Sequence, residues 1–102
     1  MSTLHEVGRT AELPPGKARL VQVGGKSIAL FNVGGRFYAL DNTCTHRGGP
    51  LAEGKVEGPG VICPWHGSEF ELQTGKVLKP PATRPVTAYR VVVEGDRIKI
   101  EF

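Results

Sequence analysis

The sequence predicts an all-β protein built from antiparallel strands. Fourteen glycines and eight prolines in 102 residues favour short strands joined by tight turns over a helical bundle. Glycine pairs at 24–25 and 34–35 separate short apolar stretches rich in β-branched and aromatic residues, a pattern typical of β-hairpins. No stretch shows the apolar period of 3.6 over ten or more residues that indicates a long helix.

The expected strands fall into two groups on either side of a different kind of segment. Before that segment we expect strands at 18–23, 26–33 and 36–41. After it, residues 86–102 alternate apolar and polar side chains and predict a hairpin turning at 94–96. The N-terminal segment has only a weak strand pattern, and we assign no role to His5.

The segment between the two groups is dominated by glycine, proline and polar residues. It contains only short strand-like pieces, near 61–62, 70–72 and 76–78, and room for one helical turn within 49–54. We therefore expect one domain, 1–102, in which a loop-rich subdomain at approximately 42–85 is inserted into a β-framework.

Composition and charge indicate a folded, water-soluble domain. Hydrophobic residues make up 39% and charged residues 23%, and no window approaches the roughly 18 apolar residues of a membrane-spanning helix. The net charge of +3 is spread along the chain without a basic run, which argues against nucleic-acid binding and indicates only a mild preference for acidic partners. The N-terminus lacks a secretory signal pattern, so we expect a cytoplasmic protein.

Two motifs pair each cysteine with a histidine. In CTHRGGP, Cys44 and His46 are two residues apart, and in CPWHGSEF, Cys63 and His66 are three apart. Glycines follow both pairs, among them Gly48 and Gly67, and glycine lets backbone N–H groups approach a bound group closely. In a reducing compartment, such cysteines are more often metal-binding or catalytic than joined in a disulfide.

Three interpretations of these pairs compete. The first is coincidence, with Cys63 a small buried side chain and the histidines ordinary loop residues. The second is a structural zinc site, because two thiolates and two imidazoles satisfy a tetrahedral ion, although zinc fingers usually group like ligands together. The third is a [2Fe–2S] cluster with two thiolates on one iron and two imidazoles on the other, to which each loop supplies one of each kind.

The two motifs resemble the cluster-binding motifs of the Rieske family. The likeness extends to a proline-containing third loop, with Pro81-Ala82 and Pro85, and covers the chain from about Leu20 to Phe102. It implies an antiparallel β-sandwich with a loop-rich cluster-binding subdomain. It also implies that one iron of a single [2Fe–2S] cluster is bound by Cys44 and Cys63, and the other, more exposed iron by His46 and His66.

Departures from the family pattern favour its soluble ferredoxin branch. High-potential members have an additional cysteine in each motif, where this chain has Gly49 and Trp65, and they carry a membrane anchor. The resemblance is to the ferredoxin component of bacterial aromatic-ring dioxygenase systems. Phe70 replaces a tyrosine that donates to a ligand sulfur, so we expect a low-to-intermediate potential within a class range of roughly −150 to +300 mV.

Two roles are considered for each of several residues beside the four predicted ligands. Ser68 either donates to a bridging sulfide or satisfies a turn. Trp65 either packs over the cluster or contributes to a docking surface, and Arg47 either steers an acidic partner or is simply solvated. The remaining candidates for contact with the cluster are Gly48, Gly67 and Pro81.

The resemblance implies a one-electron carrier between a flavin-dependent reductase and a terminal oxygenase or other redox enzyme. We expect no catalysis by the chain itself, because no two-histidine, one-carboxylate site and no glycine-rich nucleotide fingerprint remain in it. The alternatives are a small Rieske-like subunit of a nitrite reductase-type complex and, less favoured, a zinc-binding module. We expect the isolated protein to be monomeric.

Overall fold

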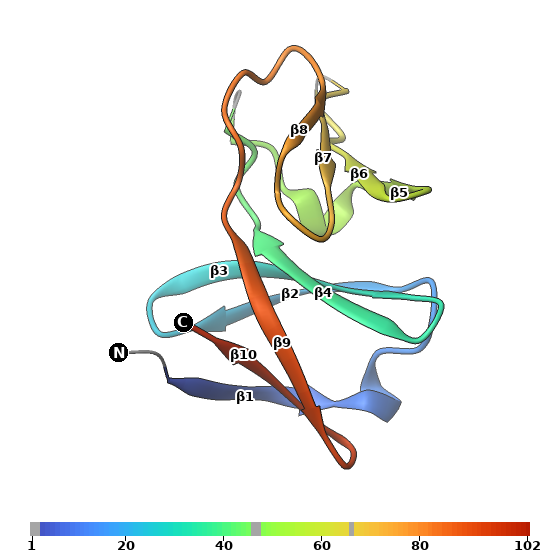
Figure 1. Ribbon diagram of the computed structural model, residues 1–102, viewed down its shortest axis with the longest axis vertical. Helices are drawn as coiled ribbons and strands as arrows, with labels where there is room; N and C mark the ends of the chain where they lie inside the picture. Colours follow the sequence, from blue (N-terminus) through green and yellow to red (C-terminus); the bar gives the residue numbers. More distant parts are fainter. Residues whose placement is uncertain (1–2, 46–47, 66) are drawn as a thin grey trace.

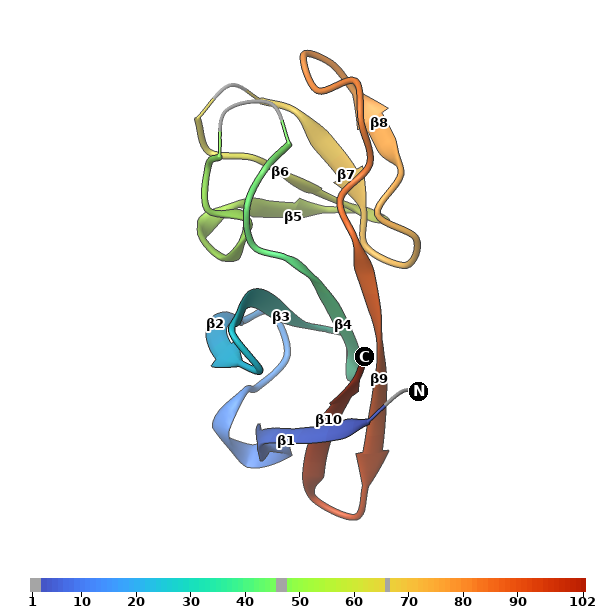
Figure 2. The ribbon, with the colours of Figure 1, turned by 90° about the vertical axis from the view of Figure 1, so that its left-hand side faces the viewer.

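The computed structural model describes residues 3–45, 48–65 and 67–102, and it consists of two antiparallel β-sheets (Figures 1 and 2). The larger sheet has the strand order β1-β10-β9-β4-β3-β2 and occupies the lower half of Figure 1. The smaller sheet, β5-β6-β7-β8, lies above it. The prediction of an all-β antiparallel protein is confirmed.

The larger sheet draws its strands from both ends of the chain. They are β1 (Leu4–Arg9), β2 (Ala18–Val23), β3 (Lys26–Val33), β4 (Arg36–Asp41), β9 (Ala88–Glu94) and β10 (Arg97–Glu101). The smaller sheet consists of β5 (Lys55–Glu57), β6 (Gly60–Ile62), β7 (Glu69–Glu71) and β8 (Val77–Lys79). Two 3₁₀ turns, η1 (Thr10–Glu12) and η2 (Leu51–Glu53), complete the regular structure of the described residues.

The glycine-pair turns fall where the sequence places them. Gly24 and Gly25 connect β2 to β3 with φ of +57° and +77°, and Gly34 and Gly35 connect β3 to β4 with +62° and +93°. Two successive residues with positive φ make a turn whose twist matches that of the strands it joins. Because only glycine adopts this conformation without steric cost, the two turns fix the register of the three-stranded meander.

The sequence patterns did not predict two of the strands, β1 and β5. Strand β1 is held by antiparallel pairing with β10, and its His5 stacks on Phe102 with ring centroids 4.1 Å apart. Strand β5 has only three residues and pairs with β6. In both, the partner strand supplies the order that the local sequence does not indicate, because strand formation depends strongly on tertiary context.

Strand β3 is buried on both faces and connects the two hydrophobic clusters of the protein. Ile28 and Leu30 point into the cluster enclosed by the larger sheet, whereas Ala29 and Phe31 point into the cluster beneath the smaller sheet. This division follows from the period of two along a strand. The second cluster also contains both cysteines, so the cysteine loops rest on the framework through a continuous apolar core.

The small sheet lies within the range 42–85, and two backbone segments join it to the framework (Figures 1 and 2). Where these segments meet, the Asp41 N–H donates to the Thr87 carbonyl at 2.8 Å and the Tyr89 hydroxyl donates to the Asp41 carboxylate at 3.2 Å. That 42–85 forms a cluster-binding subdomain of a single domain remains a prediction.

Partial burial of Tyr89 beside Asp41 should make the free energy of unfolding depend on pH in the alkaline range. Burial, followed by the charge and the hydrogen bond of Asp41, raises the pKa of Tyr89 from 10.0 to about 12. The resulting stabilisation is complete below pH 10 and is lost as the pH rises to about 12, because the unfolded chain loses this proton first. In the ¹³C NMR spectrum of ring-labelled tyrosines, Tyr89→Phe should remove the signal that titrates near pH 12. A Tyr89 signal that titrates near 10 would contradict this assignment.

Gly75 should be the glycine least tolerant of substitution at the base of the small sheet. It has φ of +78°, and a Cβ there would overlap the carbonyl oxygen of Val86. Gly25 has nearly the same φ, +77°, but a Cβ would meet open space. We expect Gly25→Ala to lower the free energy of unfolding by about 1–2 kcal/mol, and Gly75→Ala by more than about 3 kcal/mol, because the backbone must also move. Equal losses in denaturant titrations would contradict the clash.

Candidate cluster-binding site

The site predicted from the two motifs lies at the end of the molecule farthest from the β9–β10 turn (Figure 1). Of the four predicted ligands, Cys44 and Cys63 belong to the described residues. His46 and His66 lie outside them, as does Arg47. The assignment of these ligands therefore remains a prediction, and the site is built below from the cysteines and the loops that carry them.

The first loop is closed by backbone hydrogen bonds around Cys44. The Cys44 N–H donates to the carbonyl of Gly49 at 2.9 Å, and the Gly48 N–H donates to the carbonyl of Cys44 at 2.8 Å. A β-bridge between Thr43 and Pro50 joins the two ends of the loop. Gly48 has φ of +78°, the left-handed conformation that favours glycine.

The second loop repeats this pattern at the same offsets from its cysteine. The Cys63 N–H donates to the carbonyl of Ser68 at 2.7 Å, and the Gly67 N–H donates to the carbonyl of Cys63 at 3.1 Å. Gly67 has φ of +80°, nearly the value at Gly48. The two loops thus have matching backbone turns although their cysteine–histidine spacings differ, which explains why glycine follows each cysteine at the fourth position.

Gly49 brings the two loops into contact at the thiols. A Cβ on Gly49 would lie 2.6 Å from the Sγ atom of Cys63, so only glycine allows the first loop to approach this thiol. Cys44 and Cys63 are each only 2% exposed, and neither is joined in a disulfide. Two buried thiols presented by matched loops suit a thiolate-bound metal centre, because burial excludes water and competing ligands.

A third loop, between β8 and β9, is joined to both cysteine loops. The Ala82 N–H donates to Ser68 Oγ at 3.0 Å, and Thr45 Oγ1 donates to the carbonyl of Arg84 at 2.6 Å. Ser68 is fully buried, and its bonded partner lies fourteen residues away, so it connects two loops instead of satisfying a local turn. Its hydroxyl proton is not used in that bond, so donation to a bridging sulfide remains a prediction. Pro81, predicted to lie near the cluster, is an exposed residue of this loop, and its peptide bond with Pro80 is cis.

The sequence analysis missed the residue that anchors the first loop to the framework. Asn42 donates its N–H to the Ser27 carbonyl at 3.0 Å and accepts from the Leu51 and Ala52 N–H groups at 2.7 and 2.8 Å. It therefore fixes the chain just before Cys44. An asparagine immediately before a ligand motif was the available signal, since its side chain readily bonds to nearby backbone groups.

Trp65 is packed on one side and exposed on the other, and both roles considered for it remain predictions. Its ring packs against Gly49, since a Cβ there would lie 3.1 Å from Trp65 Cγ. Its exposed fraction is nevertheless 56%, the largest among the exposed large hydrophobic residues that the structure describes. The inner part of the indole thus covers the loop next to Cys63, and the outer part faces solvent.

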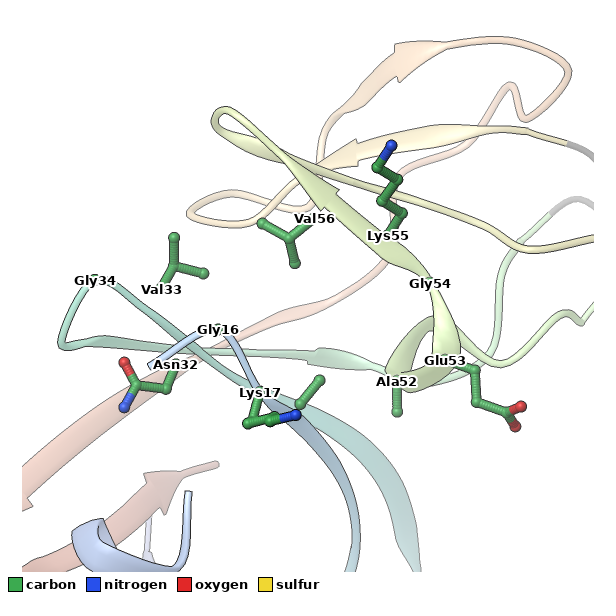
Figure 3. Close-up of a pocket in the computed structure, with 11 residues that line it drawn as sticks. Gly16, Lys17, Asn32, Val33, Gly34, Ala52, Glu53, Gly54, Lys55 and Val56 are labelled. Carbon is green, nitrogen blue, oxygen red and sulfur yellow. The ribbon is translucent and has the colours of Figure 1, made fainter. Parts of the chain in front are cut away.

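A hollow lies elsewhere on the described surface, between the two sheets (Figure 3). It has a volume of about 500 Å³, and its wall contains neither cysteine. The residues that line it are Gly16, Lys17, Ala18, Asn32, Val33, Gly34, Ala52, Glu53, Gly54, Lys55 and Val56.

Comparison with protein families identifies the family of the chain and its cofactor. The family model described as "Rieske [2Fe-2S] domain" matches residues 3–90. The chain belongs to the Rieske [2Fe–2S] family. Its cofactor is accordingly a single [2Fe–2S] cluster, so the predicted family and cofactor are both confirmed.

Curated relatives of this Rieske protein are similar over most of their length. It is 45% identical over 92 residues to the 3-phenylpropionate/cinnamic acid dioxygenase ferredoxin subunit of Escherichia coli K12, covering 89% of this chain and 86% of the relative. It is 40% identical over 90 residues to the ferredoxin component of the naphthalene 1,2-dioxygenase system of Pseudomonas aeruginosa, with coverages of 88% and 86%.

Solved structures show the same relationship. The ferredoxin of carbazole 1,9a-dioxygenase from Nocardioides aromaticivorans IC177 superposes with a TM-score of 0.92 at 31% identity, covering 96% of both chains. A chain from a complex of reduced oxygenase and oxidised ferredoxin in carbazole 1,9a-dioxygenase matches with a TM-score of 0.88 at 34% identity, covering 95% of this chain and 91% of that one. The predicted β-sandwich fold of Rieske ferredoxins is confirmed.

The close approach of Gly49 to Cys63 should be necessary for cluster loading. Gly49→Ala places a methyl group 2.6 Å from Cys63 Sγ, so the two loops must separate. We expect this variant to retain less than about half of the wild-type iron and acid-labile sulfide, since a distorted ligand shell binds metal weakly. The control is Gly58→Ala, where φ is +56° but a Cβ meets no atom within 4 Å. Full loading of Gly49→Ala would contradict the prediction.

Proposed function

We propose that this Rieske protein is a one-electron carrier that passes electrons from a flavin-dependent reductase to a terminal oxygenase or another redox enzyme. The observation that carries the proposal is that two matched loops, each with a buried cysteine, meet at the Cys63 thiol in a chain that belongs to the Rieske family. We assign Cys44 and Cys63 to one iron and His46 and His66 to the other. The bound cluster supplies a one-electron couple.

The chain's own residues would keep that couple dry and rigid. The 2% exposure of the two cysteines excludes water from the sulfur side of the site, and their N–H groups are held in backbone bonds. The Ser68–Ala82 and Thr45–Arg84 bonds hold the third loop against the other two. A site that changes little in geometry between oxidation states suits electron transfer. Catalysis by the chain itself is not part of the proposal.

The relatives' names support the choice of partners. Both curated relatives are ferredoxin parts of dioxygenase systems, and one matching structure is a complex of a ferredoxin with its oxygenase. Among the residues that the structure describes, no helix has the length and hydropathy needed to span a bilayer. We propose that this protein works in the cytoplasm and is monomeric when isolated.

The alternative of a permanent subunit is kept for a structural reason. A putative NADH-dependent nitrite reductase small subunit from Mycobacterium tuberculosis superposes with a TM-score of 0.91 at 24% identity, covering 100% of this chain and 96% of that one, a likeness that shows the fold alone. Co-purification separates the two roles, since a carrier is isolated alone and an obligate subunit brings a large catalytic chain with it. A zinc module would be colourless and is disfavoured by the family match.

The ligand assignment should be visible in the electron paramagnetic resonance spectrum of the dithionite-reduced protein. We expect one [2Fe–2S] cluster per chain and an average g value below that of an all-cysteine cluster, because imidazoles bind one of the irons. Iron and acid-labile sulfide are measured on the same sample. An all-cysteine spectrum would exclude the histidine ligands, and a protein without iron would exclude the electron-carrier function.

Replacing one histidine ligand should change the midpoint potential in a known direction. His66→Cys substitutes a thiolate for a neutral imidazole, so the cluster becomes more negative and harder to reduce. We expect voltammetry to show a midpoint lower by the order of 100 mV, within the difference between Rieske and all-cysteine clusters. The matched control, His5→Cys, lies in β1 and should leave the potential unchanged. An unchanged midpoint in His66→Cys would refute His66 as a ligand.

A further inference from the structure

We propose that the three loops around the site form a docking surface for an acidic redox protein, which receives Trp65 in an apolar recess surrounded by carboxylates. This inference rests on the proposed electron-carrier function and adds the chemistry of the partner. The docking surface is defined as the exposed residues among those described in the first loop (43–45 and 48–50), in the second loop (63–65 and 67–68), and in the third loop together with the last residue of β8 (79–87).

The three loops form one continuous surface. Gly49 and Trp65 bring the first and second loops into contact, and the Thr45–Arg84 and Ser68–Ala82 hydrogen bonds connect the third loop to both. Figures 1 and 2 show all three at the same end of the molecule, away from the larger sheet.

Trp65 is the apolar centre of this surface. Its indole is 56% exposed, and it follows the exposed Pro64 in the chain; the third loop also exposes Pro80 and Pro81. Tryptophan is the residue type most enriched among side chains that dominate binding energy at protein interfaces. Because Gly49 supports the inner edge of the ring, the indole is held in place before a partner arrives and loses little conformational freedom on binding.

The charge of the surface has a single sign. The three loops contain no aspartate or glutamate, whereas their sequences include Arg47, Lys79 and Arg84. The Nζ atom of Lys79 lies 3.6 Å from Oε1 of the largely buried Glu69, so this carboxylate offsets part of the lysine charge. Within the described residues, the exposed guanidinium of Arg84 has no ion-pair partner.

Charges on the framework are arranged differently. Arg9, Arg19 and Arg97 of the larger sheet each face a carboxylate, at 3.3, 3.9 and 3.6 Å. All ten aspartates and glutamates of the chain lie outside the three loops, so carboxylates offset the cations of the framework, whereas the docking surface has no carboxylate of its own. Uncompensated charge of one sign steers a partner of opposite charge during diffusional encounter, so the partner's rim must be acidic.

The test compares two electron acceptors of opposite charge. The cluster-loaded protein, reduced with dithionite and then desalted, is mixed in a stopped-flow instrument with an oxidised plastocyanin that has an acidic face, or with basic cytochrome c. One electron passes to the copper(II) or iron(III) of the acceptor. We expect the rate constant for plastocyanin to fall about tenfold as ionic strength rises from about 0.01 to 0.15 M. The rate constant for cytochrome c should not fall.

Single substitutions separate the two parts of the surface. Arg84→Gln should lower the plastocyanin rate about threefold at low salt and flatten its salt dependence. Trp65→Ala should lower it about tenfold at both ionic strengths, with Trp65→Phe in between as the variant that keeps a ring on Gly49. The controls are Arg36→Gln and Leu20→Ala. Arg36 is an exposed arginine of β4 with no ion-pair partner among the described residues, and Leu20 is an exposed leucine of β2. Both should match the wild type.

Three further measurements make the outcome unambiguous. Iron and sulfide content and the midpoint potential are determined for every variant, so rates are compared at equal loading and driving force. Titration calorimetry of the oxidised protein with oxidised plastocyanin measures the Kd of the complex without electron transfer. The variants that lower the rate should raise this Kd. A wild-type protein without a cluster would refute the electron-carrier function. A loaded protein whose rates with both acceptors respond identically to salt, or an Arg84→Gln that matches Arg36→Gln, would refute only the docking inference.

Discussion

The close approach of the Gly49 backbone to the Sγ atom of Cys63 is the constraint on which the site depends. It lets two loops that are separate in sequence present their thiols to one place, and it leaves no room for a side chain between them. Matching backbone hydrogen bonds around Cys44 and Cys63 hold the two loops in the same kind of turn. Glycine is needed here for close packing, and at Gly48 and Gly67 for positive φ.

The framework supports this site through one doubly buried strand. Strand β3 contributes Ile28 and Leu30 to the core of the larger sheet, and Ala29 and Phe31 to the core that includes both cysteines. Burial of this one strand therefore contributes both to the core of the framework and to the core beneath the loops. Asn42 and the Asp41–Tyr89 bond add polar restraints where the chain enters the upper part.

The same loops have opposite properties on their inner and outer sides. Inside, they bury two thiols and a serine hydroxyl, which favours a dry centre of fixed geometry. Outside, they expose an indole and prolines, apolar surface of the kind that marks interaction sites, together with the positive charge of Arg84. The hollow between the sheets has neither property, and it lies apart from the cysteines. The proposed electron transfer requires a covered centre close to a docking surface, and we infer that the loops supply both.

The sequence by itself determined the β-meander, the hairpin turns and the pair of cluster motifs, because each is encoded by neighbouring residues. A glycine pair dictates its own turn, and alternating apolar residues dictate their own strand. Only the tertiary structure decided the roles of β1 and β5, the bond from Ala82 to Ser68, and the contact of Gly49 with Cys63. These interactions join residues that lie far apart along the chain, or strands whose order comes from a partner, so no local pattern contains them.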